Sequence, residues 1–113
     1  MSQTYERLTS IQDLDNVLAS GQRVVLFKHS LTCPVSTAAF REYQKYLAET
    51  DETPATYTLI EVQNARDVSN EIAARLGVKH ESPQALVVEG GSNVLWHASH
   101  WSITKDSLTN AIH

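Results

Sequence analysis

The single cysteine of this chain has the spacing of a thiol redox motif but lacks the second sulfur. Cys33 and Ser36 stand at the two ends of Cys33-Pro34-Val35-Ser36, where a hydroxyl replaces the second thiol of a Cys-x-x-Cys pair. Such a cysteine can form a mixed disulfide with a substrate, because its thiolate can attack a disulfide sulfur. It cannot release that substrate by closing a disulfide of its own. These residues therefore predict a thiol–disulfide exchange site with one sulfur.

The predicted start of a helix at this motif favours a thiolate. Pro34 suits the first helical position, because its missing N–H would have no acceptor there. Cys33 is then the N-cap residue and faces the free amides of the first turn. These amides and the positive end of the helix dipole stabilise an anion. We therefore expect Pro34, Val35 and Ser36 to stabilise the thiolate, with the serine hydroxyl donating a hydrogen bond to it. An inert buried cysteine, the common state of a free thiol, is the alternative.

Hydrophobic patterning around the motif predicts alternating helices and strands. Four segments carry apolar residues at helical spacing, and four others are β-branched or continuously apolar. The order α-β-α-β-α-β-β-α predicts an α/β three-layer sandwich with a mixed four-stranded sheet, as a single domain over residues 1–113. The predicted helices are 10–19, 34–49, 67–76 and one capped by Thr104, and the predicted strands are 23–30, 56–62, 84–88 and 94–99.

Local signals predict how some of these elements begin and end. Thr9 and Gln12 have the spacing of a capping box at the first helix. Residues 51–54 are expected to break the helix that starts at Pro34, and Val35 is expected on the inner face of that helix.

Composition and charge exclude several classes of function. The net charge of −4 comes without a basic block that could neutralise phosphates, so we expect no nucleic-acid partner. No segment approaches the roughly 20 apolar residues of a membrane span. The residues from Met1 to Arg7 lack the apolar core of a secretory signal, and a lone cysteine fits a reducing compartment, so a cytoplasmic protein is expected. His97 and His100 have no recognisable ligand spacing, so no metal site is expected.

A proline precedes the third predicted strand. Pro83 at a strand start has a sufficient structural explanation, and trans is the more common state of an X-Pro bond. A cis Ser82–Pro83 bond would turn the Ser82 backbone toward a neighbouring loop and offer its amide and carbonyl to a peptide-like ligand.

Three stretches of the chain together resemble the signature sequences of one family. They are Phe27-Lys28-His29-Ser30-Leu31-Thr32-Cys33-Pro34-Val35-Ser36, Val78-Lys79-His80-Glu81-Ser82-Pro83-Gln84 and Trp96-His97-Ala98-Ser99-His100-Trp101. With the order of elements, they resemble the monothiol bacilliredoxins of the thioredoxin superfamily. That resemblance implies a thioredoxin-like fold in which the proline before the third strand is cis.

The same resemblance implies a function in recovery from oxidative stress. A bacilliredoxin is a thiol–disulfide oxidoreductase whose cysteine, here Cys33, removes bacillithiol from S-bacillithiolated client proteins. Free bacillithiol, the co-substrate, then regenerates the cysteine, and a flavin-dependent bacillithiol disulfide reductase recycles the released disulfide; no cofactor stays bound. By superfamily analogy, the Ser82–Pro83 backbone and Thr32 would hold the ligand, and Lys28 could meet a bacillithiol carboxylate.

Two other functions are open to the sequence. The thiol could serve in a non-catalytic redox sensor, or in an iron–sulfur carrier module of the monothiol-glutaredoxin type, whose dimer would share one cluster through external thiols. The sequence also leaves glutathione or coenzyme A open as the small thiol, and it does not identify client proteins or the oligomeric state.

Overall fold

One mixed sheet of five strands organises the protein in our computed structural model, which describes residues 3–50 and 55–113. The strand order is β1-β3-β2-β4-β5; β1 and β2 pair with β3 in parallel, and β4 pairs antiparallel with β2 and β5. The strands are β1 (Glu6–Arg7), β2 (Val24–His29), β3 (Thr56–Glu61), β4 (Gln84–Glu89) and β5 (Asn93–Ser99). The expectation of four strands was wrong, because β1 is a two-residue edge strand too short to give a sequence pattern.

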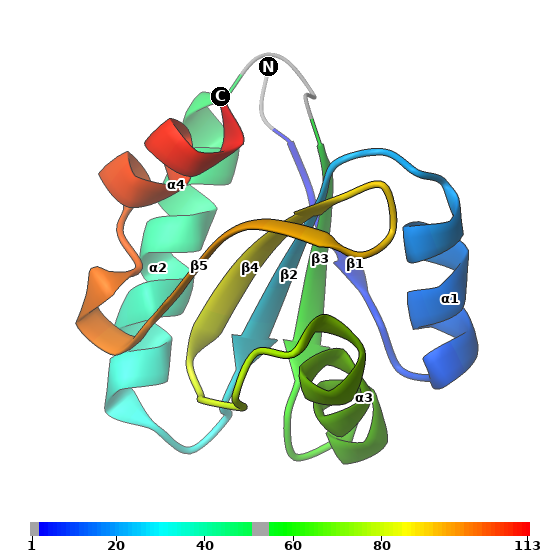
Figure 1. Cartoon of the computed structure of the whole chain (residues 1–113). Coiled ribbons are helices and arrows are strands. Elements are labelled where there is room, and N and C mark those ends of the chain that lie inside the picture. The colour runs from blue at the N-terminus through cyan, green and yellow to red at the C-terminus, as the bar shows by residue number, and fades with distance from the viewer. Residues whose placement is uncertain (1–2, 51–54) are drawn as a thin grey trace.

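Helices cover both faces of this sheet and confirm the predicted three layers (Figure 1). Figure 1 shows α2 and α4 on one face and α1 and α3 on the other, and each face has its own apolar core cluster. The helices are α1 (Ile11–Ala19), α2 (Pro34–Glu49), α3 (Arg66–Leu76) and α4 (Lys105–Ile112), and a short 3₁₀ helix, η1 (His100–Ser102), precedes the last of them. None of these helices is long and apolar enough to cross a bilayer within the described residues.

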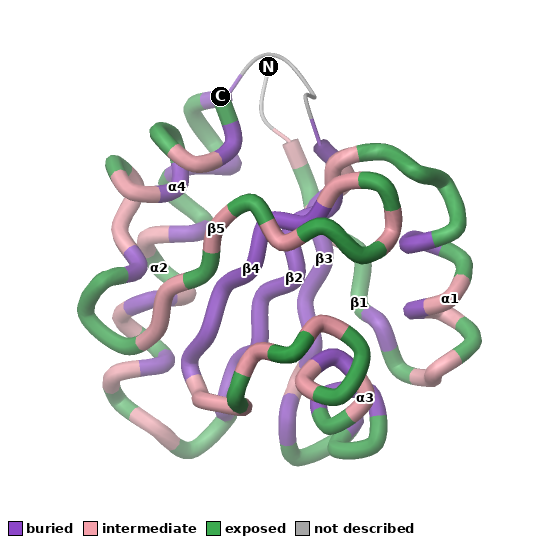
Figure 2. The backbone as a smooth tube through the Cα atoms, in the orientation of Figure 1, coloured by how far each residue is buried: buried purple, intermediate pink, exposed green. Residues whose placement is uncertain are grey.

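Strand β2 lies in the middle of the sheet and is buried along its whole length (Figure 2). Successive side chains of a strand point to opposite faces, so Val25 and Phe27 pack in the α2–α4 cluster while Val24 and Leu26 pack in the α1–α3 cluster. The continuous apolar run of the sequence is thus explained by burial on both faces.

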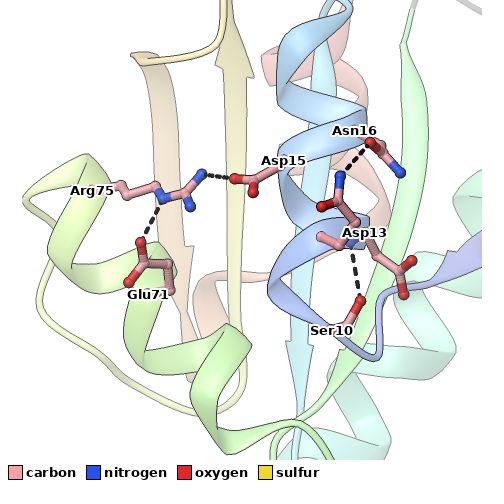
Figure 3. Close-up of polar contacts among 7 residues, drawn as sticks. Ser10, Asp13, Asp15, Asn16, Glu71 and Arg75 are labelled. Carbon is pink, nitrogen blue, oxygen red and sulfur yellow. Dashed lines mark hydrogen bonds and ion pairs between the residues drawn. The ribbon is translucent and has the colours of Figure 1, made fainter.

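Polar contacts fix α1 and connect it to α3 (Figure 3). The N-cap of α1 is Ser10, whose Oγ accepts a hydrogen bond from the Asp13 N–H at 3.1 Å. The predicted capping box of Thr9 and Gln12 was therefore wrong by one residue. Between the helices, the Arg75 guanidinium pairs with Asp15 of α1 and with Glu71 of its own helix.

Helix α2 has the predicted bounds, but its inward face differs at one position. Ser36 is fully buried, whereas Val35 is only half-buried. A hydroxyl is buried there because it has two polar partners, described below. The predicted helix break at residues 51–54 lies outside the described residues.

Candidate functional site

The cysteine lies where the sequence predicted, at the start of α2. Cys33 is the N-cap residue with extended backbone, Pro34 follows at the first helical position, and the thiol is free and half-buried. The first-turn amides of an α-helix lack intrahelical acceptors, and the helix dipole is positive at this end. A thiolate at Cys33 would therefore meet a favourable electrostatic environment, although the side chain makes no capping hydrogen bond in this structure.

The hydroxyl of Ser36 contacts two groups at the end of β2 in this structure, and its predicted hydrogen bond to the thiolate stays a prediction. Its Oγ accepts a hydrogen bond from the Ser30 N–H at 2.8 Å and lies 2.8 Å from Nδ1 of His29. Burial lowers the pKa of His29, which favours the neutral ring, and a neutral Nδ1 can accept the Ser36 proton. Ser36 is a positioning residue that ties the end of β2 to the first turn of α2.

A glutamine that sequence reasoning missed holds the same loop from the other side. Gln63, just after β3, accepts a hydrogen bond from the Leu31 N–H at 3.0 Å through Oε1. Its Nε2 donates to Ser30 Oγ at 2.9 Å and to Thr32 Oγ1 at 3.3 Å. Thr32 thus lies beside the cysteine, and its hydroxyl oxygen accepts a hydrogen bond from Gln63. No sequence motif marks Gln63, since its partners are 31 to 33 residues away.

Replacement of Ser36 by alanine should destabilise the protein without removing its sulfur. Ser36→Ala leaves the buried Ser30 N–H without its acceptor, so the free energy of unfolding should fall by about 1–3 kcal/mol. Urea denaturation measures this change. Thr37→Ala is the matched control, because the Thr37 hydroxyl is exposed and should be worth less than about 0.5 kcal/mol. Equal losses in the two variants would contradict the positioning role.

A hollow of about 450 Å³ opens beside the cysteine. Residues 31–34, 37, 38 and 41 line it, from the loop after β2 and the first two turns of α2. Its volume lies in the range of small-molecule sites. Leu31, with 47% of its surface exposed, adds an apolar wall. The thiol therefore faces a space that a small ligand or an extended side chain can enter.

Lys28 does not line the hollow beside the cysteine in this structure, and its predicted role in ligand binding stays a prediction. Lys28 is fully buried, and its Nζ lies 3.2 Å from Nδ1 of His80, which also contacts Ser69 Oγ at 3.2 Å. Strand parity explains this placement, because Lys28 shares its face of the sheet with Leu26 and points toward α3, while Cys33 starts α2 on the other face. Burial lowers the pKa of Lys28 to about 8.

The Ser82–Pro83 bond is cis, as the family resemblance implied and against the estimate from local sequence. Gln84 at the start of β4 pairs with Lys28, so Pro83 lies at the end of the sheet where β2 ends and the cysteine loop begins. Figure 1 shows the start of β4 beside the end of β2. Pro83 is buried, and the Ser82 Oγ is buried without a hydrogen-bond partner among the described residues. The structure thus brings Ser82 and Pro83 to the same end of the sheet as the cysteine loop.

The end of β5 closes against this proline. The N–H of His100 donates to the Pro83 carbonyl at 3.1 Å, and His100 has a φ of 54°, in the left-handed region. Its Nδ1 lies 3.6 Å from a carboxylate oxygen of Glu81. The next residue, Trp101, leaves 71% of its surface exposed, whereas Trp96 packs against the core.

Within the described residues, no group of three or more His, Cys, Asp or Glu side chains could hold a metal ion.

Mild acid should lower the stability of the folded protein through two histidines, His29 and His80. Burial lowers the pKa of both His29 and His80, and the Lys28 charge lowers that of His80 further. The unfolded chain therefore takes up protons first as the pH falls through about 6.5, and stability decreases there. Urea midpoints at about pH 7.5 and about pH 5 should show this loss. His80→Gln should reduce it, whereas His97→Gln, at an exposed position, should not. A pH-independent midpoint would contradict the argument.

Comparison with known proteins adds to this geometry. The family model described as monothiol bacilliredoxin BrxC matches residues 6–108. A solved thioredoxin-fold protein described as a candidate oxidoreductase is 36% identical, with a TM-score of 0.86 over 96% of this chain and 94% of that one. Thioredoxin from Malassezia sympodialis (13% identity, TM-score 0.77, 97% and 89% covered) and mitochondrial thioredoxin 3 from Saccharomyces cerevisiae (12%, 0.73, 96% and 92%) share the fold.

Proposed function

Because this chain belongs to the monothiol bacilliredoxin family, we propose that it removes bacillithiol from mixed disulfides on client proteins through nucleophilic attack by Cys33. The coarser activity, that of a thiol oxidoreductase with a thioredoxin fold, follows from the family and from the relative at 36% identity. The observation that carries the proposal is the free, half-buried thiol at the N-cap of α2, open to a hollow of about 450 Å³.

The exchange takes place in two steps that conserve electrons and atoms. The Cys33 thiolate attacks the bacillithiol sulfur of the client's mixed disulfide, a Cys33–bacillithiol disulfide forms, and the client leaves as its thiolate. A free bacillithiol thiolate then attacks the bacillithiol sulfur held on Cys33. This second exchange releases the Cys33 thiolate together with bacillithiol disulfide, which a separate flavin-dependent reductase returns to two thiols.

One sulfur suffices for this route and also limits it. Cys33 is the only cysteine of the chain, so the enzyme-bound mixed disulfide must be resolved by an external thiol. The two-sided anchoring of the loop by Ser36 and Gln63 supports the proposal, because it fixes the approach to the sulfur before a substrate arrives. A reducing cytoplasm that contains a free small thiol is the setting in which this resolution works, and we propose that location for the protein.

Mass spectrometry of a single-turnover mixture tests the proposal. The reduced protein is mixed with an equal amount of a client protein that carries one bacillithiol. We expect the client to lose the mass of bacillithiol and the protein to gain it on Cys33, followed by loss of the adduct when free bacillithiol is added. A client that keeps its bacillithiol would overturn the proposal. Visible absorption of an iron–sulfur cluster in the purified protein would instead favour the carrier function.

A further inference from the structure

The positive side chain that lines the hollow beside Cys33 is Arg41, whereas the sequence had suggested Lys28. Lys28 is buried on the far face of the sheet and does not line the hollow in this structure. The hollow beside the sulfur nevertheless contains one positive side chain, that of Arg41. It contains no acidic side chain, and its other lining residues are neutral.

Arg41 has no side-chain partner within the described residues, and of the cations without one it alone lines the hollow. Six of the nine Lys and Arg residues make an ion pair or a hydrogen bond to another side chain. Within the described residues, Arg41 makes neither, and the carboxylate one position along the helix, Glu42, is already bound by Lys45 and by the Lys105 N–H. The Arg41 charge therefore stays uncompensated at the edge of the hollow.

Helix geometry directs this side chain toward the sulfur. Residue 41 lies eight positions after Cys33, about 12 Å along the axis at a rise of 1.5 Å per residue. Side chains of an α-helix lean toward its N-terminus, so Arg41 extends back over the turn that holds Thr37 and Ala38. These two residues line the hollow together with Cys33 and Arg41.

From this arrangement, we propose that Arg41 binds a carboxylate of the small thiol whose sulfur is bonded to Cys33. The inference rests on the proposed function, which makes that ligand a carboxylate-bearing thiol. A guanidinium is suited to the task, because its fork of N–H donors matches the two oxygens of a carboxylate. With a net charge of −4, the protein as a whole repels anions, so a local cation matters more at this position.

Two small disulfides of different charge test the inference without any client protein. Cys33 reacts with dianionic dithiobis(nitrobenzoate) or with neutral dithiodipyridine, and each reaction forms a mixed disulfide and releases one aromatic thiol that absorbs light. For Arg41→Gln, the second-order rate with the dianionic reagent should fall about two- to fivefold at low salt, the range of a single exposed ion pair. The rate with the neutral reagent should not change.

Control variants separate a local contact from net charge. Arg41→Lys should keep most of the preference for the anionic reagent. Lys45→Gln, on the next turn of α2 and outside the hollow, changes the net charge equally and should leave both rates alone. In about 1 M salt, where the screening length is near 3 Å, the effect of Arg41→Gln should vanish. Equal changes with both reagents, or no change with either, would overturn the role of Arg41.

The same variant then links the charge to the small thiol. Formation of the Cys33 mixed disulfide from bacillithiol disulfide, with release of one bacillithiol thiolate, should slow in Arg41→Gln, while formation of the corresponding adduct from the neutral disulfide of mercaptoethanol should not. Failure of the wild-type protein to take bacillithiol from a client would overturn the proposed function. A loss of charge preference in Arg41→Gln would in that case still assign Arg41 to a carboxylate-bearing thiol of another kind.

Discussion

Cys33→Ser should lose all transfer of bacillithiol from client proteins while folding at least as well as the wild type. A hydroxyl at this position is far too weakly acidic to supply the nucleophile that thiol–disulfide exchange requires. Serine is, however, a better N-cap than cysteine, since its oxygen accepts hydrogen bonds from first-turn amides. We therefore expect release of bacillithiol at the rate measured without protein, together with a stability equal to the wild type or higher by up to about 1 kcal/mol.

Client mass spectra over time measure the first effect, and urea denaturation measures the second. The matched control is the wild-type protein alkylated at its single thiol, which should be inactive in the same way. Residual transfer above background in Cys33→Ser would show that another group performs the reaction, and the proposed mechanism would then be wrong. An unfolded variant is recognised by circular dichroism, and Cys33→Ala provides a second inactive form.

Lys28→Met should stabilise the protein near neutral pH and flatten part of its pH dependence. Burial lowers the pKa of Lys28 from 10.5 to about 8, a difference equivalent to about 3 kcal/mol at 1.36 kcal/mol per pH unit. Below about pH 8 the folded protein carries this buried charge at full cost. Between about pH 8 and 10.5 the unfolded chain binds more protons than the folded one, so stability rises with pH.

The methionine variant removes this cost and leaves the neighbouring ring with a partner. Ser69 Oγ lies 3.2 Å from the same Nδ1 of His80, so His80 retains a donor after Lys28 is replaced. We expect a gain of up to about 3 kcal/mol at about pH 7 and a smaller gain toward pH 9.5. Above about pH 10 the raised pKa values of the buried Tyr43 and Tyr57 work in the opposite direction, so measurements should stop before that point.

Denaturation by urea at several pH values gives the free energies, and Lys79→Met is the control. Lys79 is exposed, one residue from His80, so its replacement should change stability by less than about 0.5 kcal/mol at any pH. A Lys28→Met variant that is less stable than the wild type at every pH, with an unchanged slope, would show that the lysine contributes more by its contacts than it costs by its charge.

The fold was predictable because its core elements carry strong local patterns. The apolar run of β2 and the helix led by Pro34 each identify an element without its neighbours. Strand β1 was not predictable in the same way. Its two residues have no periodicity, and they form a strand only because the edge of β3 is available to pair with them.

Within the site, the sequence located the sulfur but not the network around it. The N-cap position of Cys33 follows from Pro34, a neighbour in the chain. The partners of Ser36 and the role of Gln63 depend on hydrogen bonds between segments that only the folded chain brings together. The burial of Lys28 was not predictable, because a continuously apolar strand does not show in the sequence which face is open, and lysines are mostly exposed in folded proteins.

The uncovered indole that follows His100 gives the protein an intrinsic fluorescent reporter. Trp96 packs on the core, whereas Trp101 is exposed to water. Trp101 directly follows His100, whose N–H donates a hydrogen bond to the Pro83 carbonyl. A client that settles over the cis-proline loop would shield that second ring, shifting its emission toward shorter wavelength. Tryptophan fluorescence would therefore report the binding of an unlabelled client in real time, before thiol–disulfide exchange takes place.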